Sequence, residues 1–224
     1  MLKINDCTIR VGTTDIKPVS EVRNLGSWLD CDFSMSTHIS KSCSAAFLWL
    51  HNIKRVSKFL SRDKLETVLY AFVTSSIDYC NELSYGLPDC EIAKLQRVQN
   101  AVAQLLTSSR KYDHITPVLQ ELHWLPVKFR IHFQILLLTF KALNGMAPAY
   151  TSDLIIVRKH ARYSLRSLNS GTLPLHPAGK MKRCFSVSAP ILWIALPASR
   201  RSISSIFIFK SRLKTYLFKL AFSL

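Results

Sequence analysis

Two carboxylates separated by a single residue are the first candidates for chemistry. Asp30 and Asp32 have the spacing with which phosphoryl-transfer enzymes hold Mg²⁺. Aspartate is also common in turns, and a solvated turn between a strand and a helix accounts for the pair better. The chain has only six glycines and no glycine-rich phosphate-binding loop. We therefore expect no metal site here.

Two histidine-containing groups raise the possibility of acid–base or nucleophilic chemistry. Tyr112, Asp113 and His114 suggest an Asp/His dyad, but a turn leading into a helix explains them as well, because no third group follows at an interpretable spacing. His123 precedes Trp124, and a hydrogen-bonded residue in a packed turn is a simpler interpretation than a metal ligand. The sequence indicates no catalytic residues, and we expect no enzymatic activity from this chain alone.

The cysteines point to a reducing compartment. They lack the paired spacing of a zinc site, and no closely spaced Cys/His set appears. The first ten residues also lack the apolar core of a signal peptide. We expect an intracellular protein, cytoplasmic or nuclear rather than secreted, with reduced thiols at Cys7, Cys31, Cys43, Cys80, Cys90 and Cys184.

The charge of the chain suggests an anionic partner. The 224 residues include 30 Lys and Arg against 14 Asp and Glu, a formal net charge of +16. Every acidic residue lies at or before Asp153, so the remaining C-terminal third is purely basic. Such a field suits phosphate backbones or anionic lipid.

The pattern of apolar residues predicts a mainly helical protein that begins with a small β-hairpin region. Residues 2–33 alternate apolar and polar positions and are broken by turn residues, as short strands require. The segment 126–145 is apolar around most of a helix, is bracketed by Pro126 and Gly145, and is interrupted by charges that exclude a membrane span. We expect it to be the central core helix. Further helices are predicted over 36–60, 63–83, from 89 to about 109, 116–122, 150–155 and 205–224, with apolar packing over 185–197 and a basic loop over 156–184.

The faces of these helices can also be predicted. Asp63 and Glu66 have the spacing of a capping box, and the helix after them should carry Leu65, Leu69, Phe72 and Val73 on its apolar face. The last helix should dock on the body through Phe209, Leu213, Tyr216, Leu217 and Leu220.

Several stretches, in the right order and over nearly the whole chain, resemble one family. They are VRNLGSWLD (22–30), SSIDYCNELSYGLP (75–88), LQRVQNAVAQLL (95–106), KYDHITPVLQELHWLPVKFRI (111–131), LLLTFKALNGMAPAY (136–150), CFSVSAPILWIALP (184–197) and FKSRLKTYLF (209–218). They look like the C-terminal part of the reverse transcriptase of non-LTR (LINE-type) retrotransposons, with the Jockey and chicken-repeat group closest. The DHITPVLQELHWLPV stretch is the most specific.

The resemblance implies an RNA-directed DNA polymerase without its catalytic part. The Tyr-x-Asp-Asp tetrad that binds Mg²⁺ in the parent polymerase is absent, so this chain needs no cofactor of its own. Residues 1–33 would be the end of the palm with primer-grip strands, 34–112 a thumb-like helical bundle, and 113–224 a family-specific helical extension. Leu25 and Gly26 would lie near the primer grip. Ile194 stands where the family usually has asparagine, and Met1 falls after the active site, which suggests a degraded or truncated copy.

A polymerase thumb holds an RNA–DNA template–primer without reading its sequence, so it needs cations on helix faces. We therefore expect RNA and DNA as partners and no small-molecule substrate; the oligomeric state stays open. The expected phosphate-binding residues are Lys54, Arg55, Lys58, Arg62, Arg97, Arg110, Lys111, Arg158, Lys159 and Arg162.

Two other classes of function remain open. The aromatic, basic segment 205–224 could bind a membrane surface, although such a stripe more often docks on its own core. The chain could instead be a structural helical adaptor or a relic without a function, since basic helix faces are often simply solvated.

Overall fold

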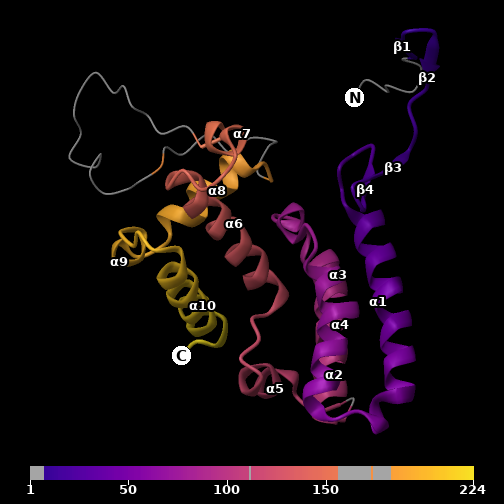
Figure 1. Ribbon diagram of the computed structural model, residues 1–224, viewed down its shortest axis with the longest axis vertical. Coiled ribbons are helices and arrows are strands. Elements are labelled where there is room, and N and C mark those ends of the chain that lie inside the picture. Colours follow the sequence, from indigo (N-terminus) through magenta and orange to yellow (C-terminus); the bar gives the residue numbers. More distant parts are fainter. Residues whose placement is uncertain (1–7, 111, 156–172, 174–182) are drawn as a thin grey trace.

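The protein is mainly helical, with two small antiparallel hairpins at its N-terminal end, which confirms the predicted fold class (Figure 1). The computed structural model describes residues 8–110, 112–155, 173 and 183–224. Lys111 and most of the predicted basic loop 156–184 lie outside the described residues.

The strands form two separate two-stranded sheets. Strand β1 (Ile9–Val11) pairs with β2 (Thr14–Ile16), and β3 (Glu21–Asn24) pairs with β4 (Ser27–Asp30). The apolar side chains of the first hairpin are exposed, and Figure 1 shows this hairpin standing away from the helices. The second hairpin continues directly toward the first long helix, so only this one is placed to contact the helical body.

The first group of helices packs around an amphipathic leading helix. Its apolar stripe, at positions 39, 43, 46, 50 and 53, repeats every three or four residues and is buried. The elements in order are α1 (Ser36–Val56), η1 (Ser57–Phe59), α2 (Arg62–Leu69), the π-helical turn η2 (Tyr70–Thr74), α3 (Ser75–Asp78), η3 (Asn81–Ser84) and α4 (Asp89–Thr107).

Two details of the α2 region differ from the sequence prediction. The helix begins at Arg62 after Ser61, without a side-chain cap, so the predicted capping box at Asp63 and Glu66 is wrong. Phe72, expected to be inward, is 44% exposed. Val73, predicted on the same face, is buried. The exposure of Phe72 comes from η2, because a π turn adds a residue to the helical repeat and turns position 72 outward while Val73 and Ile77 stay buried.

The second group of helices surrounds the predicted core helix. Figure 1 shows α6 between the α1–α4 group and α10, as its apolar circumference requires. The elements are α5 (Ile115–Glu121), α6 (Val127–Leu143), α7 (Ala149–Asp153), α8 (Phe185–Ile194), α9 (Ala198–Arg201) and α10 (Ile206–Phe222).

Aromatic packing fastens the last helix to the core helix. The rings of Phe140 on α6 and Phe209 on α10 stack with centroids 4.2 Å apart, and Trp193 on α8 lies 5.8 Å from Phe209. Leu213 and Leu217 continue the buried stripe of α10. Leu220 is 55% exposed, so its predicted place in the stripe is wrong: α10 extends past the surface that covers it.

A buried amide network joins α4 to α6. The Gln99 side chain donates from Nε2 to the Leu125 carbonyl at 2.8 Å, and the Val127 amide donates to Gln96 Oε1 at 2.9 Å. Gln96 Nε2 in turn donates to Gln99 Oε1 at 2.9 Å. Two glutamines on α4 therefore satisfy the backbone of the turn that starts α6, which fixes where the core helix begins.

Removing a ring of the aromatic stack should destabilise the protein much more than removing an exposed phenylalanine of the same helix. We expect Phe209→Ala to lower the free energy of unfolding by about 3–5 kcal/mol, because it leaves a cavity beside Phe140 and Trp193. Phe207→Ala, on the same helix but 81% exposed, is the matched control and should cost less than about 0.5 kcal/mol. Urea unfolding measures both, and equal losses would contradict the packing described.

Burial also changes the pKa of a histidine on the core helix, His132. His132 lies beside the rings of Tyr85 and Phe129, with centroids 5.8 and 5.9 Å away. Desolvation, aided by the charge of Lys128, lowers the pKa of His132 from 6.5 to about 4. Between pH 6.5 and about pH 4, His132 is protonated in the unfolded chain but stays neutral in the folded protein. The free energy of unfolding therefore falls as the pH drops through this range.

This shift predicts a pH dependence of stability. From pH 7 to pH 4 the His132 contribution should fall by about 3 kcal/mol, at about 1.4 kcal/mol per pH unit. His132→Phe keeps a ring at this site but cannot titrate. From pH 7 to pH 4 the unfolding free energy of this variant should therefore fall by about 3 kcal/mol less than that of the wild type. Urea titrations at each pH measure the difference, in which the contributions of other titrating groups cancel. Parallel pH profiles would show that His132 is not the group responsible.

Candidate nucleic-acid interface

The C-terminal end of α1 carries the densest group of predicted phosphate-binding residues. Lys54 and Arg55 lie in the last turn of α1 and Lys58 lies in η1, and all three side chains are exposed. Their spacing keeps Lys54 and Lys58 on one side of the helix end. Within the described part of the chain none of the three pairs with a carboxylate, so their charges face solvent. We call Lys54, Arg55 and Lys58 the α1 basic cluster.

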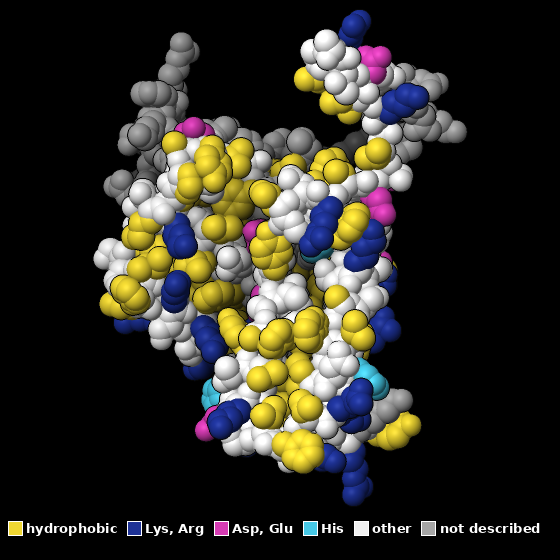
Figure 2. Space-filling model, turned by 45° about the vertical axis from the view of Figure 1, so that its right-hand side comes forward, with side chains coloured by type: hydrophobic (Ala, Val, Ile, Leu, Met, Phe, Trp, Pro, Cys, Tyr) yellow, Lys and Arg dark blue, Asp and Glu magenta, His cyan; other side chains and the backbone are white. Residues whose placement is uncertain are grey.

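The structure places the other described candidates on different elements. Arg62, at the start of α2, forms an exposed ion pair with Glu121 of α5 at 3.9 Å, a distance at which surface pairs contribute little. Arg97 is exposed on α4 and donates from Nε to its own helix, at the Ala93 carbonyl. Arg110 is exposed after α4. Figure 2 shows Lys and Arg on one face as separate groups among hydrophobic side chains, rather than as a continuous band.

Four further candidates cannot be placed. Lys111, Arg158, Lys159 and Arg162 lie outside the described residues.

Exposed aromatic side chains lie on the same elements as the α1 basic cluster and on η2, and the sequence prediction did not include them. Trp49 on α1 and Phe72 on η2 are both partly exposed, with ring centroids 4.7 Å apart. Phe59 is largely exposed, and Lys58 Nζ lies 4.9 Å from its ring centroid. The run 47–50 already contained a signal, because four consecutive apolar residues cover more than one face of a helix and some must be exposed.

The predicted primer-grip residues form the turn between β3 and β4. Leu25 has φ +46° and is 85% exposed, while Gly26 has φ +90°. The Tyr79 hydroxyl donates to the Leu25 carbonyl, and a Cβ at position 26 would lie 3.3 Å from Tyr79 Cε1. The glycine thus permits a close backbone approach, as its type suggested, and the group approached within the chain is the Tyr79 ring.

A second set of contacts ties the same hairpin to α1. Lys41 Nζ lies 3.3 Å from the Trp28 ring centroid and 3.0 Å from Glu21 Oε1. The Trp28 amide donates to His38 Nδ1 at 3.4 Å. The β3–β4 hairpin is therefore attached to the helices through His38 and Lys41 in the first turns of α1 and through Tyr79.

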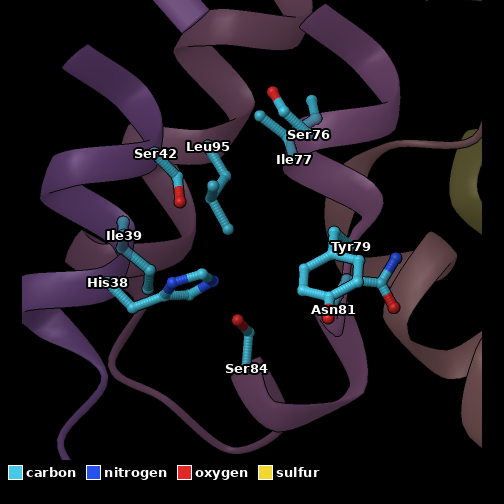
Figure 3. A pocket seen from close by; sticks show the side chains of 9 residues that line it. All are labelled: His38, Ile39, Ser42, Ser76, Ile77, Tyr79, Asn81, Ser84 and Leu95. Carbon is cyan, nitrogen blue, oxygen red and sulfur yellow. The ribbon is translucent and has the colours of Figure 1, made fainter. Parts of the chain in front are cut away.

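A small cavity lies next to this junction. It is lined by residues that include His38, Ser42, Tyr79, Asn81 and Ser84, and Figure 3 shows the His38 ring and the hydroxyls of Ser42 and Ser84 pointing toward the same space. Its volume of about 10 Å³ is room for one water molecule at most. Burial lowers the pKa of His38. This polar space is too small for a substrate.

The aspartates that the sequence offered as candidates for chemistry, Asp30 and Asp113, act as turn-forming residues. Asp30 accepts hydrogen bonds from the Ser34 amide at 2.6 Å and the Ser34 hydroxyl at 2.9 Å. Burial alone would raise the pKa of Asp30, but these bonds outweigh it and lower the pKa. Asp113 likewise accepts from the Arg110 amide at 2.7 Å. These bonds confirm turns at both places, and no group of three or more potential metal ligands occurs among the described residues.

His123 also matches its predicted role. Its Nδ1 lies 3.1 Å from the Glu121 carbonyl, and its ring stacks on Phe218 of α10 with centroids 5.7 Å apart. The residue is therefore a hydrogen-bonded member of the turn between α5 and α6, packed on a neighbouring helix.

Comparison with known proteins adds no relative. No family model, no curated protein and no solved structure matches the chain. Among the described residues, no helix is both long and apolar enough to cross a bilayer.

The tight contact at Gly26 leads to a prediction about the hairpin. Gly26→Ala should loosen the β3–β4 hairpin, because alanine is strained at this positive φ and its Cβ presses on Tyr79. Amide hydrogen exchange of residues 21–30 should speed up about tenfold, corresponding to a cost of about 1.4 kcal/mol.

Gly12→Ala is the control for that measurement. Gly12 also has a positive φ, but no atom lies within 4 Å of the added Cβ, so residues 21–30 should exchange at the wild-type rate. Unchanged exchange in Gly26→Ala would contradict the anchoring of the turn on Tyr79.

Proposed function

We propose that the chain is the part of a non-LTR retrotransposon reverse transcriptase that follows the catalytic palm. In this proposal it holds an RNA–DNA template–primer without sequence preference and does not polymerise by itself. The observation that carries the binding role is the α1 basic cluster, whose three cations have no carboxylate partner within the described residues. Unpaired surface cations are what counterion release from a phosphate backbone requires.

The position of the most specific motif supports the family assignment. The stretch 113–127 spans α5 and the start of α6, where Leu119, Leu125 and Val127 are buried. The Leu125 carbonyl and Val127 amide bond to the two glutamines of α4, which belong to another of the resembling stretches. The stretches 95–106 and 113–127, which resemble the same family, are therefore joined by hydrogen bonds. These bonds give a physical reason for both stretches to occur in one chain.

The exposed ring of Phe59 adds a second property expected of a nucleic-acid surface. An aromatic side chain beside a cation, here Lys58, offers a stacking surface for an unpaired base in addition to phosphate contacts. In this proposal the α1 basic cluster supplies most of the affinity, and the sequence of the nucleic acid has little effect.

The membrane alternative depends on α10. The apolar residues that would enter a bilayer include Phe209, Leu213 and Leu217, and these are buried in the core, whereas Phe207 and Leu220 are exposed. A helix that uses its stripe for packing has less apolar surface left for lipid. Flotation with anionic liposomes, run beside nucleic-acid retention, separates the two functions.

Reversing two charges of the cluster tests the proposal. Lys54→Glu with Lys58→Glu should weaken binding to an RNA–DNA hybrid about tenfold or more at about 0.1 M salt, and should reduce the slope of log K against log salt by about two. Fluorescence anisotropy over a salt series measures both quantities.

The matched control changes net charge equally at a distant site. Arg10→Glu with Lys17→Glu lies on and after the first hairpin, away from the helices, and should leave the salt slope unchanged. Equal losses in the two double variants would mean that overall charge, not the cluster, provides the affinity. Metal-dependent primer extension by the purified chain would refute the non-catalytic part of the proposal.

A further inference from the structure

A second site is suggested by a cleft between the two groups of helices. It has a volume of about 410 Å³, within the range of small-ligand sites. Tyr70, His123 and Lys214 are exposed at its rim, whereas Asn81 and Leu125 are buried at its floor. These residues come from η2, η3, the turn before α6, and α10, so the cleft depends on the packing of α6 between the α1–α4 group and α10 (Figure 1).

Two residues that line this cleft have polar atoms that are closed off from solvent and have no partner within the described residues. Arg130 Nη2 pairs with Asp78 Oδ2 at 2.9 Å, but Arg130 Nη1 and Asn81 Oδ1 are buried and have no hydrogen-bond partner within the described residues. An unpaired buried donor and an unpaired buried acceptor are each unfavourable. Rotation of these two side chains toward the cleft would bring this donor and this acceptor to the edge of a ligand that carries an acceptor beside a donor.

Aromatic side chains make up much of the remaining lining. Tyr70, Trp124 and Phe133 all border the cleft, and the His123 ring at the rim is held by stacking on Phe218. Such rings offer offset-stacked or edge-to-face contacts to a flat π system. A heterocyclic base provides both this face and an edge of alternating donors and acceptors.

The charges at the cleft favour an anionic substituent on that ring. Burial raises the pKa of Asp78, while Arg130 and Asn81 act against this rise. The Asp78–Arg130 pair is neutral as a unit, and Lys214 at the rim has no carboxylate partner among the described residues. From these contacts we infer that the cleft binds a single nucleotide unit, with its base among the aromatic side chains and its phosphate at Lys214.

This site shares no residue with the α1 basic cluster, so it does not rest on the proposed function. The nucleotide can come from two sources, a free mononucleotide or the unpaired end of a nucleic-acid strand. The inference departs from the sequence-based expectation that the chain has no small-molecule ligand.

Calorimetric titration of the full chain with each ribonucleoside 5′-monophosphate tests the site. We expect at least one to bind with Kd below about 1 mM, and ribose 5-phosphate, which lacks the base, to bind at least about tenfold more weakly. Equal binding of ribose 5-phosphate would show phosphate attraction alone and overturn the inference. Absence of binding by every mononucleotide and by the strand end described below would overturn it as well.

Two exposed residues can be changed without disturbing the core. Tyr70→Ala should weaken mononucleotide binding about tenfold by removing a stacking surface, and Lys214→Met should weaken it about fivefold while leaving the uncharged nucleoside unaffected. Tyr150→Ala and Lys210→Met are the controls, since both residues are exposed and neither lines the cleft. Wild-type affinity in both cleft variants would contradict the assignment.

The source of the nucleotide is decided with an RNA–DNA hybrid that is blunt or carries one unpaired 3′ nucleotide. If the overhang increases affinity in the wild type but not in Tyr70→Ala, the cleft binds strand ends; if only free mononucleotides bind, it binds the free ligand. The Lys54→Glu, Lys58→Glu variant should retain mononucleotide binding. Failure of the proposed duplex binding therefore leaves the cleft result intact, and the converse also holds.

Discussion

The burial of α6 on nearly all sides is the constraint on which the rest of the structure depends. A helix that is apolar around most of its circumference cannot face water, so other elements must cover it. On one side the glutamines of α4 bond to the backbone where α6 begins, and on the other Phe209 of α10 stacks on Phe140. These two attachments bring the two groups of helices together and thereby create the cleft between them.

The same packing determines which charges are available to a partner. With the apolar stripes of α1, α6 and α10 turned inward, the lysines and arginines between those positions are left at the surface. Most of the acidic partners that could neutralise them are absent, since every Asp and Glu lies at or before Asp153. The α1 basic cluster lies in the part of the chain that does contain acidic residues, yet none of them pairs with it among the described residues, and a surface charge without a partner attracts an external anion.

The two proposed sites draw on different properties of the fold. The α1 basic cluster is local, formed by residues within five positions of one another at a helix end, and it depends little on the rest of the chain. The cleft is non-local, because Asp78 and Arg130 meet across 52 residues and Lys214 comes from the last helix. The network of Gln96, Gln99 and Leu125 also crosses the proposed boundary between the thumb-like bundle and the extension, so these two parts are joined by buried hydrogen bonds.

The sequence by itself determined the mainly helical class, the positions of the long helices α1, α4, α6 and α10, α6 as the core helix, and the basic cluster at the end of α1. These features depend on periodicity and on residues close in the chain, whose relative positions a helix dictates. Only the tertiary structure decided that Phe72 and Leu220 are exposed, that Tyr79 anchors the turn at Gly26, and that Arg62 is paired with Glu121. Each of these depends on a π turn, on where a covering surface ends, or on a contact between distant segments, and such long-range packing leaves no periodic signal along the chain.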